Sequence, residues 1–154
     1  MTTAGACVPE LGSLSEKEGA VLKDFQSLLR LNLSYIEPLS TVPAELLPHL
    51  FLGSRDDAVN AKVLQSLGIT HVQHYDLLAN LANAVAEKKG RLFVHCEAGV
   101  NRSGSLCLAY HAATSGMTLL ESAQHCKARR GRICTNPAFQ LQVFGFARKH
   151  QLPL

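Results

Sequence analysis

The sequence has no long apolar run, since nothing in its 154 residues approaches the roughly 20 consecutive apolar residues of a transmembrane helix. Residues 1–20 also lack the basic start and the apolar stretch of a secretory signal. Charge of one sign is scarce too: the net charge of +3 is too small to suggest a nucleic-acid-binding protein. We therefore expect an intracellular protein of the cytoplasm or nucleus, with neither a membrane nor nucleic acid as a partner.

Closely paired cysteines are missing as well. The five cysteines are an odd number, and none stands in a Cys-x-x-Cys pair. Without an export signal, reduced thiols are expected rather than a disulfide framework. His125, Cys126 and Cys134 do not have the spacing of zinc ligands, so we expect no metal, and no other cofactor. We interpret Cys107, Cys126 and Cys134 as core or surface thiols.

Alternating strand and helix patterns run through the chain. With 47% hydrophobic and 18% charged residues, 154 residues can form one globular domain with a real core. Short apolar runs alternate with segments of helical periodicity, which predicts an α/β fold with a mostly parallel sheet flanked by helices. Strands are expected at residues 49–53, 69–72 and 91–95, and helices at 15–36, 55–68, 75–90, 102–116, 118–131 and 138–151.

One strand-loop-helix segment, residues 91–113, carries the chemistry. An apolar strand ends at His95, Cys96 follows, and a short loop leads to Arg102 at the start of a helix. A loop this short curls the backbone so that successive N–H groups point inward and form an anion-binding nest, and Gly99 is needed where a side chain would block the curl. The helix N-terminus and the two-pronged guanidinium of Arg102 match the oxygens of a phosphate.

The same electrostatic field acts on the thiol of Cys96. A cysteine at a helix N-terminus beside an arginine can fall from a pKa of about 8.5 to ~3.5–7.5, so it is a thiolate at neutral pH. A thiolate facing a bound phosphate is a nucleophile aimed at phosphorus. The alternative interpretation is a small buried hydrophobic side chain at the end of a strand.

A basic run at residues 127–132 concentrates four of the fifteen basic side chains. One interpretation is a solvated helix end, which gives the run no functional role. The other is a rim that attracts an anionic substrate.

The segment "VHCEAGVNRSG" resembles the active-site signature His-Cys-x-x-Gly-x-x-Arg-Ser/Thr of the cysteine-dependent protein phosphatases. It is most similar to the dual-specificity phosphatases, in particular to the small atypical members. Residues 46–72, 108–131 and 133–146 resemble that family's flanking segments in the same order. The resemblance implies a catalytic domain at residues 43–154. Before it, the Gly-, Ser- and Thr-rich composition predicts a disordered stretch at 1–15, and helical spacing predicts a helical extension at 16–42.

The resemblance also implies a role for each matching residue. Cys96 is the nucleophile that forms a phosphocysteine, and Arg102 holds the equatorial oxygens of the phosphate. His95 helps to set the thiolate, and Ser103 donates to the sulfur when it leaves. Asn136 resembles an asparagine that supports the loop, although Thr135 stands where a proline is usual. The phosphate-binding set is Glu97, Ala98, Gly99, Val100, Asn101 and Arg102.

The chain departs from the family between its second and third expected strands. Residues 73–93 leave room for one helix and a turn, but not for the further strands and the aspartate loop that the family carries there. That aspartate protonates the leaving oxygen. Asp76 is the doubtful local substitute, because "YDLL" fits the start of a helix better, and Asp56 and Asp57 also fit a helix start. A missing internal block resembles a shortened splice form or an incomplete gene model.

Two classes of function follow from this combination. An intact Cys96 and Arg102 favour a protein phosphatase acting on phosphotyrosine and phosphoserine/threonine, whose partner is a phosphorylated protein substrate. The missing acid loop favours a weak or inactive module that binds phosphoproteins without turnover.

Overall fold

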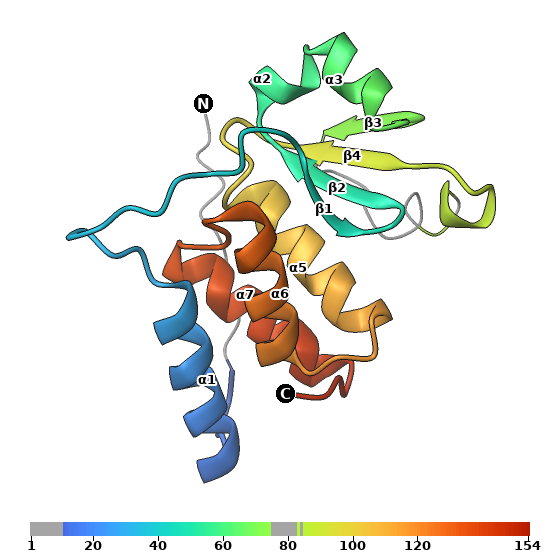
Figure 1. Ribbon diagram of the computed structural model, residues 1–154. Helices are drawn as coiled ribbons and strands as arrows, with labels where there is room; N and C mark the ends of the chain where they lie inside the picture. Colours follow the sequence, from blue (N-terminus) through green and yellow to red (C-terminus); the bar gives the residue numbers. More distant parts are fainter. Residues whose placement is uncertain (1–10, 75–82, 84) are drawn as a thin grey trace, which may run out of the picture.

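The computed structural model describes residues 11–74, 83 and 85–154, and its described strands form one sheet (Figure 1). β4 runs parallel to both of its neighbours, β2 and β3, whereas β1 runs antiparallel to β2. The expected α/β fold with a mostly parallel sheet is confirmed. The strands are β1 (Ala44–Leu47), β2 (Leu50–Gly53), β3 (His71–His74) and β4 (Leu92–His95), in the order β1-β2-β4-β3.

Helices cover both faces of this sheet, because alternate residues of β2 and β4 point to opposite sides. Phe51 and Phe93 form a small cluster with Leu64 under α2 and α3. The other face meets α5, α6 and α7 in the larger core, which includes Leu50, Leu52, Leu92 and Val94. The helices are α1 (Glu16–Leu29), α2 (Arg55–Ala58), α3 (Ala61–Ser66), α5 (Arg102–Thr114), α6 (Leu119–Arg130) and α7 (Pro137–Lys149).

The first helix, α1, packs on the outside of α6 and α7. Ser15 begins it with a capping box, in which Glu18 reaches back to the Ser15 backbone. Phe25 and Leu29 are fully buried in the same core as the strands and α5. The N-terminal helix therefore stabilises the domain that carries the site.

Two expected helices have different limits in the structure. The helix expected at 15–36 ends at Leu29, because Arg30 leaves the helical conformation with ψ of 134°. Beyond it, the Asn32 side chain accepts from the Ser34 N–H, a local bond that competes with helical hydrogen bonding. The helix expected at 55–68 is two short helices, because Asn60 caps a new start by accepting from the Val63 N–H. Residues 30–43 are accordingly irregular.

The remaining expectations are mixed. Strands at 49–53 and 91–95 are confirmed as β2 and β4, and β3 begins two residues later than expected. β1 was not expected, because prolines at 43 and 48 bracket it. Most of the helix expected at 75–90 lies outside the described residues, although residues 85–87 are helical. No described helix has the length and apolar character to cross a membrane.

Candidate active site

Cys96 lies at the junction between the end of β4 and the start of α5. Its side chain is buried at 4% exposure, and Arg102 is the first residue of α5, with an exposed side chain. The other described cysteines are buried in the core, where burial raises the pKa of Cys126 and of Cys134 to about 12. Cys96 is therefore the described thiol placed for chemistry.

The loop between Cys96 and Arg102 turns its carbonyl groups outward. Each carbonyl oxygen from residue 97 to residue 101 accepts a hydrogen bond from the surrounding scaffold. A trans peptide places a C=O and the next N–H on opposite sides, so the N–H groups of residues 98–102 face inward. The five donors are Arg55 N (to Glu97), Arg130 Nη2 (to Ala98), Arg130 Nε (to Gly99), Cys134 N (to Val100) and Ser105 N (to Asn101), at 2.7–3.1 Å.

The Cys96 sulfur lies among these inward N–H groups. The Ser103 hydroxyl donates to it at 3.1 Å, and the N–H groups of Ser103, Gly99 and Val100 also donate to it. Burial raises the pKa of the Cys96 thiol, but the hydrogen bonds outweigh burial and leave the pKa below its ordinary value. The hydrogen bonds therefore favour the thiolate form of Cys96.

This pKa predicts a selective reaction with iodoacetamide, because only the thiolate attacks. We expect Cys96 to be alkylated with a pH midpoint below the ~8.5 of free cysteine, since below the midpoint the sulfur is protonated and unreactive. Ser103→Ala should move that midpoint upward by removing one donor. Peptide mapping across a pH series measures both. A wild-type midpoint at or above that of free cysteine contradicts the proposed thiolate.

Gly99 adopts a left-handed conformation, with φ of 65°, at the tightest point of the loop. A Cβ added there would lie 2.1 Å from the Gly53 carbonyl oxygen and 2.9 Å from Nη2 of Arg130. The loop thus closes over the end of β2 at a separation that excludes any side chain at residue 99.

Gly99→Ala should destabilise the chain by about 2–5 kcal/mol, since strain at positive φ adds to steric overlap with backbone. Gly19→Ala is the matched control, because Gly19 lies in α1 with nothing within 4 Å of an added Cβ, and it should stabilise by about 0.5–1 kcal/mol. Urea unfolding of both variants measures the difference. Equal stability of Gly99→Ala and wild type would show that the loop is built differently.

Arg130 supports the loop from behind and was not identified from the sequence. It is 1% exposed, and it donates to the carbonyl oxygens of Ala98 and Gly99 and to the backbone and hydroxyl oxygens of Ser40. Both interpretations of the basic run, a solvated helix end and a substrate rim, are wrong for this residue. A charge run does not show which of its members turns inward, so the sequence held no signal for it.

A second support comes from the loop before α7. The Asn136 N–H donates to Oδ1 of Asn101 at 2.9 Å, and the Thr135 hydroxyl donates to the same oxygen at 3.4 Å. The Asn136 side chain instead caps α7 by accepting from the Ala138 N–H. Asn136 thus contacts the loop through its backbone.

His95 lies beside the loop at the end of β4. Its Nδ1 donates to the Cys96 carbonyl oxygen at 3.3 Å, and its ring stacks on Phe93 with centroids 5.8 Å apart. These contacts fix the ring next to the nucleophile through the backbone and Phe93. Its role in setting the thiolate stays a prediction.

The candidate acids are distributed unevenly around the loop. Asp76 lies outside the described residues. Asp57 accepts from the backbone and hydroxyl of Ser54, so Asp56 and Asp57 begin α2 as expected. Asp24 is exposed on α1. None of the aspartates in the described part of the chain is placed by these contacts as a proton donor to a leaving group.

The family model for the dual specificity phosphatase catalytic domain matches residues 72–149, half of the chain. The chain belongs to the dual-specificity phosphatase family. Its likeness to the small atypical members of the protein tyrosine phosphatase superfamily, expected from the signature around Cys96, is confirmed.

Among curated relatives, dual specificity protein phosphatase 1-A of Xenopus laevis is 31% identical over 135 residues, covering 68% of this chain and 37% of that protein. A MAP kinase phosphatase with leucine-rich repeats, protein 3 of Dictyostelium discoideum, is 29% identical over 177 residues, covering 90% of this chain and 20% of that protein. The chain therefore spans well under half the length of either relative.

These dual-specificity phosphatases also support the shortened segment. Because 68% of 154 residues is about 105, about 30 of the 135 aligned residues of the Xenopus protein have no counterpart in this chain. This difference agrees with a block of the domain that is missing from this chain.

Solved structures share the fold. The human tyrosine phosphatase-like serine/threonine/tyrosine-interacting protein superposes with a TM-score of 0.66 at 22% identity, over 73% of this chain and 99% of that one. A mouse dual specificity phosphatase complexed with zinc tungstate gives 0.61 at 23% identity, over 78% and 96%. At these identities the likeness establishes the fold alone.

Proposed function

We propose that this chain hydrolyses phosphate monoesters on phosphorylated tyrosine, serine and threonine side chains of proteins. The observation that carries the proposal is the Cys96 sulfur, whose pKa is lowered by hydrogen bonds within a loop whose N–H groups face inward. The same donors that hold the thiolate can bind the oxygens of a phosphate.

The reaction has two displacements at phosphorus. The Cys96 thiolate forms the S–P bond as the ester P–O bond breaks, and the leaving oxygen takes the electron pair and a proton. Water then attacks phosphorus, the S–P bond breaks, and inorganic phosphate leaves. Ser103, which donates to the sulfur at 3.1 Å, stabilises the departing thiolate in this second step.

The proton for the leaving oxygen is the weak point of this mechanism. A positioned general acid typically contributes ~10²–10⁴-fold. Without the family's aspartate loop, water supplies that proton, so leaving groups that depart as stable anions react best. We propose an enzyme with an intact nucleophile and poor turnover of protein substrates.

The second candidate function is a phosphoprotein-binding module. The described aspartates are committed to helix starts or lie exposed on a helix, and the loop that would bind phosphate is complete. The structural likeness to the human tyrosine phosphatase-like serine/threonine/tyrosine-interacting protein supports a binding role by analogy. Incubating the purified chain with a small aryl phosphate separates the two, because a phosphatase releases phosphate and a binding module returns the ester intact.

A further inference from the structure

A cationic cavity lies between the irregular segment after α1 and the connection from α6 to α7. Its volume is about 200 Å³, and it is lined by residues from both segments. Three of these side chains are cations, Arg30, Lys127 and Arg132, and one is an anion, Glu37. The cavity therefore carries a formal charge of +2, the complement of a dianion.

One of these cations is incompletely satisfied. The Nε of Arg132 is buried and has no hydrogen-bond partner among the described residues. Lys127, by contrast, donates to the Leu28 carbonyl oxygen at 3.0 Å and pairs with Glu37 at 3.4 Å. A buried donor without an acceptor is destabilising, so an anion whose oxygens can accept a hydrogen bond is favoured at Arg132.

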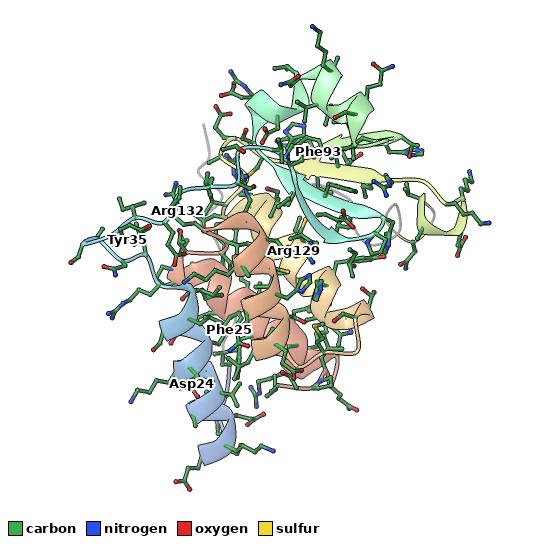
Figure 2. All side chains as sticks on the ribbon, viewed as in Figure 1. Asp24, Phe25, Tyr35, Phe93, Arg129 and Arg132 are labelled. Atoms are coloured by element: carbon green, nitrogen blue, oxygen red, sulfur yellow. The ribbon has the colours of Figure 1, made fainter. Side chains whose placement is uncertain are left out.

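Tyr35 lines the same cavity and is 65% exposed. Figure 2 shows it on the outward bend of the segment after α1, with Arg132 nearby in the connection that follows α6. Its neighbours Leu33 and Ile36 are 82% and 52% exposed, so they contribute little to the core. An exposed tyrosine in an irregular segment is accessible to a kinase.

We propose that Tyr35 is a phosphorylation site whose phosphate is held in this cavity by Arg132, Arg30 and Lys127. A tyrosine kinase transfers the γ-phosphoryl group of ATP to the Tyr35 oxygen, ADP leaves with the electron pair of the broken P–O bond, and the phenol proton passes to the kinase. The product carries a charge of about −1.5 to −2 at neutral pH, which matches the cavity. Its oxygens can accept from the arginine guanidinium groups.

The modified residue would fasten a segment that already supports the catalytic loop. The Ser40 N–H donates to the Arg130 carbonyl oxygen at 2.9 Å, and Arg130 holds the loop carbonyls. Pro38 lies so close to Gly131 that a Cβ on Gly131 would be 2.0 Å from its carbonyl oxygen. Phosphorylation of Tyr35 thus adds an ionic contact to a segment that is already held against the domain at residues 38–40.

The experiment uses the full chain carrying Cys96→Ser, so that it cannot remove its own phosphate, and Tyr75→Phe, which leaves Tyr35 and Tyr110 as its tyrosines. A purified tyrosine kinase and ATP should modify Tyr35. Tyr110 is the internal control and should stay unmodified. It is only 6% exposed, and its hydroxyl is hydrogen-bonded to His49 and Asn83.

Phosphorus NMR then measures whether the cavity holds the phosphate. Its second pKa should fall from about 6 to about 5, and Arg132→Gln should raise it part of the way back toward 6, because Arg30 and Lys127 remain. Arg129→Gln, at an exposed position in the last turn of α6, should leave it lowered. The proposal is overturned if the kinase modifies a peptide of residues 31–40 but not the folded chain. A phosphate that titrates near 6 with Arg132 present also overturns it.

Discussion

Replacing Cys96 with serine is expected to reduce hydrolysis of a small aryl phosphate by roughly 10⁴-fold or more, because a hydroxyl is far less acidic than a thiol and does not supply a nucleophilic anion. The side chain keeps its shape and is only slightly smaller, and the surrounding donors keep an acceptor. The variant should therefore unfold in urea as wild type does. Steady-state release of the aryl alcohol measures the loss.

Arg102, in the same site, allows a second test of this prediction. Arg102→Lys keeps the charge but loses the two-pronged donor, so inhibition by inorganic phosphate should weaken about 10- to 100-fold. Arg129→Lys, which changes an exposed arginine on α6, is the control and should leave inhibition unchanged. Equal activity of wild type and Cys96→Ser would refute the enzymatic proposal.

The second large effect concerns the choice of substrate. A general acid matters most when the leaving oxygen is basic, and hardly at all for a stabilised aryloxide. We expect Cys96-dependent cleavage of activated aryl phosphates and ~10²–10⁴-fold poorer cleavage of phosphopeptides. A series of aryl phosphates with increasingly basic leaving groups measures this as a steep fall in kcat/KM.

Asp76 decides whether the shortened segment still supplies an acid. We expect Asp76→Asn to leave the cleavage rates of both activated aryl phosphates and phosphopeptides nearly unchanged. The control Asp56→Asn on α2 should also leave both rates unchanged. A loss of ~10²-fold or more on phosphopeptides, with the activated ester spared, would identify Asp76 as the acid. An aggregated or non-cooperatively melting wild type would instead show that the chain is not a working domain.

The strand, loop and helix around Cys96 could be predicted because their causes are local. The run Leu92–His95 is apolar and short, Gly99 permits the left-handed turn, and α5 follows at once. Hydrophobic spacing likewise predicted α6 and α7. The curl of the loop could be predicted because the loop is short and has a glycine at the position that needs a left-handed conformation.

The supports of the loop could not be predicted, because they come from contacts between distant segments. Arg130 reaches Ala98, Gly99 and Ser40, and nothing in a run of basic residues marks one arginine as buried. The strand β1 was missed for a related reason, since its pairing with β2 outweighs the flanking prolines. Asn60 split the helix expected at 55–68 through one side-chain hydrogen bond.

Trapping the covalent intermediate tests the central claim most directly. Ser103→Ala should slow the second displacement, because the departing thiolate loses the hydroxyl that donates to it. Acid quenching of this variant shortly after mixing with an activated aryl phosphate, followed by peptide mapping, should find one phosphoryl group on the peptide that contains Cys96. The Cys96→Ser chain should carry none there. Aryl phosphate consumed with no phosphoryl group on that peptide, or recovered intact, would contradict a phosphatase that works through Cys96.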